Sequence, residues 1–206
     1  DSKKSGSATI SHLRFGKNHT NQPYLITNAN FIACHNINFV NKYDMANDLK
    51  ENGIFLLNSP YGAENLDKFL PQNFVQTLKD KNAKLYVINA NKVAEEAGLG
   101  HRINVVMQAC FFKLTNIIPY KKVENLLIEA STKTYAKKGQ AVVDANVRAI
   151  KNATANLVEY DLFKWTPQQN DKKVSSKNVD AYDRDFIKII EHKHGDDLPV
   201  SKFSPR

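Results

Sequence analysis

The sequence predicts an α/β fold: a mostly parallel sheet with flanking helices, followed by a helical segment and an extended C-terminal tail. Two short, continuous apolar runs, residues 54–57 and 85–88, are typical of strands that are covered on both faces. Helix-like segments alternate with these runs at short intervals, which is the order that right-handed crossovers between parallel strands produce. With 42% apolar residues, a chain of 206 residues is long enough to enclose a sizeable core.

The first elements are predicted from side-chain periodicity. Residues 7–15 mix apolar and polar side chains at near-alternate positions, which predicts a strand with one face in water. Residues 31–34 form a short apolar run typical of a buried strand. Apolar side chains at helical spacing over residues 39–50 predict a helix, with Gly53 as its stop.

The middle of the chain continues the alternation of strands and helices. Glycine and proline mark the breaks between the apolar segments. In order, we expect a strand over 54–57, a helix over 66–78 with a break at Pro71, a strand over 85–88 and a helix over 92–97 ended by Gly98.

Beyond this alternation the pattern is helical. We expect helices over 104–118, 122–136 and 140–158, separated by Pro119 and Gly139, with Asn104 as an N-cap. The first of them is apolar nearly all round, which predicts burial against the sheet or another domain. Residues 1–158 are therefore expected to form one α/β domain. Residues 159–206 are expected to form a linker-like extension with a short helix near 185–193.

Charge and composition narrow the function classes. The formal net charge is +8, but the basic residues are mostly lysines spread along the chain, which favours a solvated surface over a nucleic-acid footprint. The longest apolar stretch is interrupted by polar side chains, so no membrane span is expected. Cys34 and Cys110 lie in apolar segments, which is typical of reduced thiols in the cytoplasm. The start of the chain lacks an initiator Met and a signal-like run, which suggests an internal segment of a longer polypeptide.

Two places are candidates for binding, whereas common catalytic motifs are absent and no catalytic residue is assigned. The serine-, glycine- and lysine-bearing start suits a phosphate, although a solvated strand end would have the same composition. Polar residues that follow the strands at 57 and 88 lie where ligands collect in open α/β sheets, although they could equally cap helices. The candidate residues are Lys3, Lys4, Ser11, His12 and Arg14 in the first place, and Asn58 and Ser59, with residues 89–91, in the second.

Five ordered segments carry a resemblance to a known family. DSKKSG, TISHLRFG, FIACHN, GIFLLNSPYGAENLDKFLP and YVINANKVAEEAGLGHRINVVMQACFFKL closely resemble, in this order, the gamma domain of pyruvate:ferredoxin (flavodoxin) oxidoreductases, including the fused pyruvate:NADP+ form. The match extends from residue 1 to about 158. GDDLPVSKF near the C-terminus resembles the stretch that leads out of that domain.

The resemblance implies an enzyme that oxidatively decarboxylates pyruvate to acetyl-CoA and CO2. It implies thiamine diphosphate, Mg2+ and [4Fe-4S] clusters on other domains of the same polypeptide, with ferredoxin, flavodoxin or NADP+ as the electron acceptor. It further implies a homodimer in the cytoplasm or in an organelle such as a hydrogenosome, and an isolated segment without activity.

In this family the gamma domain is associated with coenzyme A binding and with packing of the catalytic domains. The resemblance therefore makes Lys3, Lys4, His12 and Arg14 candidates for the phosphates of coenzyme A. The alternative is a purely structural docking domain with no ligand contact.

Two departures from the family pattern affect these expectations. Ser7 stands where family members usually have a second glycine, which narrows the backbone conformations of the turn. The family's glycine-rich segment, strand and helix that precede this region are not in the sequence. We therefore expect a sheet that lacks one strand and a coenzyme site that lacks a part.

Overall fold

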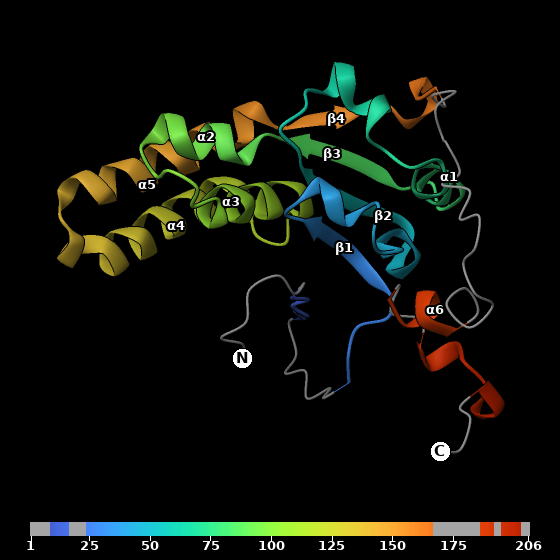
Figure 1. The fold of residues 1–206 in the computed structure, drawn as a ribbon. Coiled ribbons are helices and arrows are strands. Elements are labelled where there is room, and N and C mark those ends of the chain that lie inside the picture. Colours follow the sequence, from blue (N-terminus) through green and yellow to red (C-terminus); the bar gives the residue numbers. More distant parts are fainter. Residues whose placement is uncertain (1–8, 17–23, 167–185, 192–194, 203–206) are drawn as a thin grey trace.

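A computed structural model describes residues 9–16, 24–166, 186–191 and 195–202. The described residues form a four-stranded sheet in the order β1-β2-β3-β4 (Figure 1). Strands β1, β2 and β3 are parallel, and β4 pairs antiparallel with β3. The strands are β1 (Ala29–Cys34), β2 (Leu49–Asn58), β3 (Lys84–Ile88) and β4 (Val158–Tyr160). The predicted mostly parallel sheet is thus confirmed.

Alternate side chains of the central strands enter two cores on opposite faces of the sheet. Phe55, Leu57 and Leu85 belong to one core, together with α1 (Gln72–Asp80). Leu56 and Ile88 belong to the other. Helices α2, α3 and α5 contribute to the second core, and α4 packs on α5 and α3. These helices are α2 (Ala90–Ala97), α3 (Asn104–Thr115), α4 (Tyr120–Tyr135) and α5 (Gln140–Ala153).

Short helices complete the described part of the chain. The break expected at Pro71 is confirmed, because a 3-10 helix ends shortly before it and α1 begins directly after it. Gly98, at φ 88°, ends α2 as expected. The 3-10 helices are Ile37–Phe39, Met45–Asp48, Ala63–Lys68, Ala136–Lys138, Thr154–Asn156, Leu162–Lys164, Gly195–Asp197 and Val200–Lys202, and α6 (Lys188–Glu191) lies where a short helix was expected.

The helix predicted over residues 39–50 is wrong. Two 3-10 helices, Ile37–Phe39 and Met45–Asp48, take its place, and β2 follows at once. The side chain of Asn36 accepts a hydrogen bond from the backbone N–H of Asn38 (3.0 Å). Such local bonds of asparagine compete with a continuous helix.

Gly53 lies inside β2 rather than at the end of a helix. The pairing of β1 with β2 shifts here, so residues 50–53 bulge outward opposite a single residue of β1. Asn52 has a φ of 57°, and a Cβ atom on Gly53 would approach the Leu49 side chain to 2.7 Å. Glycine permits this close approach because it has no Cβ atom. A glycine that follows an apolar segment is also typical of a helix end, so it resembled a helix stop in the sequence.

Two further expectations are wrong. Helix α3 begins at Asn104 itself, and Ile103 is the capping residue, without a side-chain cap bond. Residues 9–15, the described part of the strand expected over 7–15, have no regular secondary structure. Alternation indicates which side chains face water, but a strand also requires a hydrogen-bonded neighbour, and none of the described strands pairs with this segment.

The packed structure continues beyond residue 158, where the boundary of the α/β domain was expected. Strand β4 crosses this position, and Tyr160, Leu162 and Trp165 are buried in the core that contains α1. Among the described residues, none of the helices combines the length and the apolar character that crossing a bilayer requires.

Candidate functional site

The side chain of Asn58 joins the carboxyl ends of β1, β2 and β3. Its amide nitrogen donates to the backbone oxygen of His35 (2.9 Å) and to the side-chain oxygen of Asn91 (3.2 Å). Its amide oxygen accepts a hydrogen bond from the backbone N–H of Ala90 (2.9 Å). Asn58 is only 6% exposed, so these bonds are made inside the protein. They tie the residue after β1 to the start of α2.

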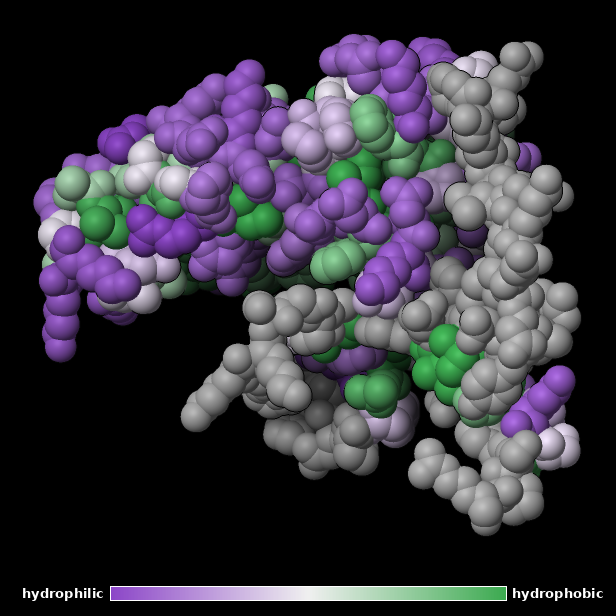
Figure 2. Space-filling view, viewed as in Figure 1, coloured by the Kyte–Doolittle hydropathy of each residue, from purple (hydrophilic) through white to green (hydrophobic). Residues whose placement is uncertain are grey.

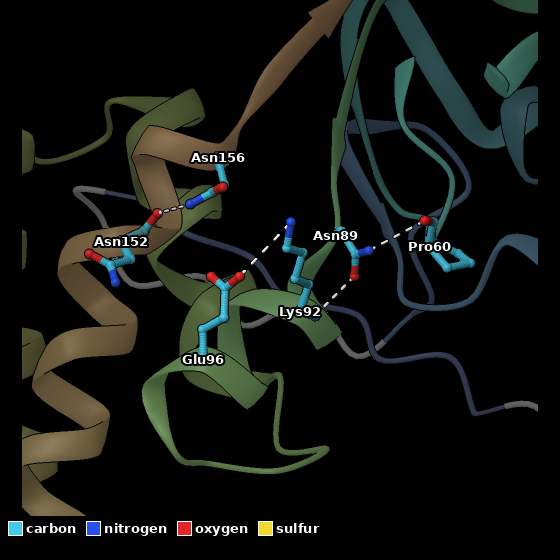
Figure 3. Close-up of polar contacts among 6 residues, drawn as sticks. All are labelled: Pro60, Asn89, Lys92, Glu96, Asn152 and Asn156. Carbon is cyan, nitrogen blue, oxygen red and sulfur yellow. Dashed lines mark hydrogen bonds and ion pairs between the residues drawn. The ribbon is translucent and has the colours of Figure 1, made fainter. Parts of the chain in front are cut away.

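Asn89 caps helix α2, so the capping interpretation of this strand end is confirmed. Its side-chain oxygen accepts from the backbone N–H of Lys92 (3.0 Å), and its amide nitrogen donates to the backbone oxygen of Pro60 (3.3 Å; Figure 3). Lys92 pairs with Glu96 (3.9 Å) one turn further along the helix. Near this helix, the side-chain nitrogen of Asn156 donates to the backbone oxygen of Asn152 (2.9 Å). The polar groups drawn in Figure 3 therefore have partners within the chain.

Ser59 is buried and bonded within its own turn. Its Oγ atom accepts from the backbone N–H of Tyr61 (3.1 Å) and lies 3.2 Å from the Tyr61 backbone oxygen. The ring of Tyr61 stacks on Phe69 with 3.4 Å between centroids. Desolvation lowers the pKa of His35 although part of its side chain reaches solvent, so the ring is neutral at pH 7. This edge of the sheet is a neutral network of satisfied polar groups.

Two runs of irregular backbone, residues 9–16 and 24–28, are bonded to each other, and we call them together the strap. The Nδ1 atom of His12 accepts from the backbone N–H of Ile26 (3.0 Å). Arg14 donates from Nη2 to the backbone oxygen of Tyr24 (2.7 Å), and its guanidinium lies 5.0 Å from the Tyr24 ring centroid. Ser11 is exposed on the same run. The structure therefore brings His12 and Arg14 together with residues 24–26, whereas Lys3 and Lys4 lie outside the described residues.

The strap is attached to the body of the protein through aromatic rings. Phe15 stacks on Phe111 of α3 at 5.8 Å and meets Phe112 edge-on at 6.3 Å. Phe111 in turn meets Phe31 of β1 at 5.0 Å. These contacts place the strap beside β1 and α3. No contact between the strap and the Asn58 network appears among the described bonds, so the two predicted places are not joined into one site by them.

A cavity of about 330 Å³ lies beside β4, and no pattern in the sequence had indicated it. Tyr160 donates its hydroxyl hydrogen to Asp67, and Tyr86 donates to Glu159 (2.9 Å). Burial, followed by the bond to Glu159, raises the pKa of Tyr86 to about 12. The carboxylates come from segments far apart in the sequence, so no local pattern could have grouped them. The acidic lining, Glu64, Asp67, Glu159 and Asp161 beside Lys164, is unsuited to phosphate.

No group of three or more His, Cys, Asp or Glu side chains among the described residues could hold a metal ion. Both cysteines are buried and reduced, and burial raises the pKa of Cys34 to about 11 and that of Cys110 to about 12. Their thiols are therefore unreactive at neutral pH.

Comparison with known proteins gives consistent similarities. Residues 1–156 match the family model described as "Pyruvate ferredoxin/flavodoxin oxidoreductase". A putative pyruvate-flavodoxin oxidoreductase of Synechocystis is 41% identical over 203 residues, which cover 98% of this chain and 17% of that protein. The pyruvate:ferredoxin oxidoreductase of Moorella thermoacetica is 41% identical over 206 residues, which cover 100% of this chain and 18% of that protein.

A solved structure supports the fold. The pyruvate oxidoreductase subunit PORC of Thermotoga maritima superposes with a TM-score of 0.52 at 20% identity, over 66% of this chain and 67% of that one. The chain spans less than a fifth of the length of the curated relatives quoted above. From the family match and the identity along its whole length, the chain belongs to the pyruvate ferredoxin/flavodoxin oxidoreductase family.

Proposed function

We propose that this chain is a gamma-type segment of a pyruvate:ferredoxin, flavodoxin or NADP+ oxidoreductase that converts pyruvate and coenzyme A into acetyl-CoA and CO2. The observation that carries the proposal is the 41% identity, over 98% to 100% of the chain, to proteins named pyruvate-flavodoxin and pyruvate:ferredoxin oxidoreductase. In this proposal, thiamine diphosphate, Mg2+ and the [4Fe-4S] clusters belong to other domains of the same polypeptide. The isolated segment is expected to be inactive, and the complete enzyme to be a cytoplasmic or organellar homodimer.

Within that enzyme, we assign the strap to the phosphate groups of coenzyme A. The bond from Ile26 makes Nδ1 of His12 an acceptor, so the hydrogen of the neutral ring sits on Nε2, which can donate to a phosphate oxygen. The bond to Tyr24 and the contact with its ring hold the guanidinium of Arg14 in place, and a guanidinium suits phosphate geometry. Ser11, Lys3 and Lys4 belong to the same basic run and complete the proposed set.

The Asn58 network supports the sheet and is left out of the proposed ligand contacts. Asn58 and Ser59 are 6% and 0% exposed, and their side-chain groups are bonded to protein atoms. A ligand would have to break these bonds to reach them. Their contribution is to fix the ends of the strands and the start of α2.

Titration calorimetry with coenzyme A tests the ligand role. Arg14→Gln should weaken binding about tenfold, because a charge-assisted hydrogen bond is lost. Lys92→Gln is the matched control, since it removes one exposed positive charge from α2, and binding should change little. Pantetheine, which lacks the phosphates, should not bind. No binding of coenzyme A at about 1 mM would remove the ligand role but not the family membership.

A docking role without ligand contact is the second candidate, and it is favoured by the exposed apolar side chains of the strap. Helix α3 was expected to be buried against the sheet or against another domain, and its buried side chains pack into the core that Leu56 and Ile88 of the sheet form with α2 and α5. Stable association with the separately expressed remainder of the polypeptide, together with no binding of coenzyme A, would support docking alone.

A further inference from the structure

Exposed large apolar side chains are concentrated in the strap. Of the twelve such side chains among the described residues, five lie in the thirteen residues of the strap. Their exposed fractions range from 51% to 69%, whereas apolar side chains of the central strands are almost fully buried. The five are Ile10, Leu13, Phe15, Tyr24 and Leu25, and we call them the strap apolar surface.

This surface is held in a defined position. The bonds from Ile26 to His12 and from Arg14 to Tyr24 fasten the two runs of the strap to each other. Phe15 anchors the first run on α3 through Phe111. In the common view of Figures 1 and 2, hydrophobic side chains appear at the surface below the sheet, in the region of the strap and α6. An apolar surface fixed in this way is typical of an interface.

The occupant that the observations favour is a further part of the same polypeptide. Relatives match the chain over 98% to 100% of its length, yet the chain is only 17% to 18% of theirs. In those proteins the equivalent segment therefore lies within a much larger body of polypeptide. The strap also adjoins β1, which pairs with β2 alone among the described strands, so the apolar surface continues toward an edge of the sheet.

We propose that the strap apolar surface is an interdomain interface, covered in the complete protein by an apolar surface of the same polypeptide outside residues 1–206. The inference rests on the proposed membership of a longer oxidoreductase and does not require coenzyme A to bind. It assigns Leu13 and Leu25 to contacts between domains. Folding of the sheet does not need these two side chains.

Thiol labelling in the 206-residue chain and in the complete enzyme tests the interface. Leu13→Cys and Leu25→Cys introduce reporters, while Cys34 and Cys110 give little background because they are buried. The reporters should react rapidly in the chain and at least about tenfold more slowly in the complete enzyme. Leu126→Cys on α4, where Leu126 is 46% exposed, is the control and should react at similar rates in both.

Three results would overturn the proposal. Equal labelling of Leu13→Cys in chain and enzyme would show that nothing covers the strap. Equal protection of Leu126→Cys would show general occlusion rather than an interface at the strap. Protection that grows with the concentration of the isolated chain, together with a dimer in sedimentation, would show that a second copy is the occupant.

A measurement on the unaltered protein gives a result that does not depend on whether the cysteine variants fold. Hydroxyl-radical footprinting of the unaltered chain and enzyme should show lower modification of Phe15, Tyr24 and Leu25 in the enzyme, and unchanged modification there would overturn the proposal. The result of this test can be told apart from the result of the coenzyme A titration. Protection of the strap without coenzyme A binding would remove only the ligand role, and binding without protection would remove only the interface.

Discussion

The sheet and the strap use their apolar side chains in opposite ways. Phe55, Leu56 and Leu57 in β2 are all 0% exposed, whereas Leu13 and Leu25 in the strap are 66% and 69% exposed. Fully burying a side chain of this size contributes about 1.5–3 kcal/mol, so the sheet gains its stability within the chain and the strap does not. The difference teaches that contacts within the chain bury the apolar side chains of the central strands and leave those of the strap exposed.

The largest expected effect is on the sheet. Phe55→Ala should lower the free energy of unfolding by about 3–5 kcal/mol, because it removes a fully buried ring that meets Phe74 edge-on at 5.0 Å. Phe163→Ala is the matched control, since Phe163 is 81% exposed, and it should change stability by less than about 0.5 kcal/mol. Urea denaturation followed by circular dichroism measures both. A loss below about 1 kcal/mol for Phe55→Ala would contradict the division between sheet and strap.

The Asn58 network should give the next effect. Asn58→Ala leaves the His35 carbonyl and the Ala90 N–H without their partner, which should cost about 1–3 kcal/mol. Asn125→Ala, on the exposed side of α4, should be neutral or slightly stabilising because alanine favours helix. Equal stability of both variants in urea would mean that the network does not support the sheet.

Lys81, at the end of α1, holds the 3-10 helix Met45–Asp48 and the start of β2. Its Nζ atom donates to the backbone oxygens of Ala46 (3.0 Å), Asn47 (2.6 Å) and Leu49 (2.5 Å). Lys81→Met keeps the aliphatic stem and removes the donors, so the unfolding free energy should fall by about 2 kcal/mol. Lys84→Met, at an exposed position of β3, provides the comparison and should have little effect. Similar denaturation midpoints for the two variants would argue against the role of Lys81.

The same contrast explains what could be predicted from the sequence. Residues 54–57 and 85–88 were identified as strands because burial on both faces leaves an uninterrupted apolar run. The helix over 39–50 was wrong because apolar spacing says nothing about the turn at Asn36 or about the bulge that makes Gly53 part of β2. Bulges and strand pairs are set by distant neighbours, and a local pattern does not contain them.

The candidate residues divide in the same way. Asn58 and Ser59 were correctly placed at the end of a strand, but the sequence does not say that their side chains are buried and bonded. The partners of Asn58, His35 and Asn91, lie far away along the chain, whereas Ser59 bonds within its own turn. His12 and Arg14 were grouped by composition, and their bonds to residues 24–26 could not be inferred because they join positions 10 and 14 residues apart, which no local pattern pairs. The sequence showed that the segment is basic, but it did not show that the segment bonds to residues 24–26.

Alkaline pH should lower the stability of the folded chain through its two buried thiols, Cys34 in β1 and Cys110 in α3. Burial raises the pKa of Cys34 to about 11 and of Cys110 to about 12, against an ordinary value of 9.0, so the folded chain holds these protons more tightly than the unfolded chain. This contribution is fully present below pH 9 and is lost as pH rises from 9 through 11 to 12. At pH 10 the loss should be about 1 kcal/mol for each thiol. Urea titrations at pH 7.5, 9 and 10 measure how the unfolding free energy falls with pH. In the double variant Cys34→Ala/Cys110→Ala this fall should be smaller. An equal fall in the variant and the unaltered chain would show that the thiols do not cause it.

The smallest effect on stability is expected in the strap. Leu13→Ser should change the unfolding free energy of the isolated chain by less than about 0.5 kcal/mol, because the side chain is already 66% exposed and loses little burial. Leu78→Ser, at a position in α1 that is 0% exposed, should cost several times more and is the matched comparison. If the strap is an interface, the same Leu13→Ser change should weaken association of the chain with the remainder of the enzyme, which Leu126→Ser on α4 should not do. Sedimentation of the mixed parts would measure this difference. A strap substitution that unfolded the isolated chain would instead make the strap part of the folding core, and the contrast with the sheet would fail.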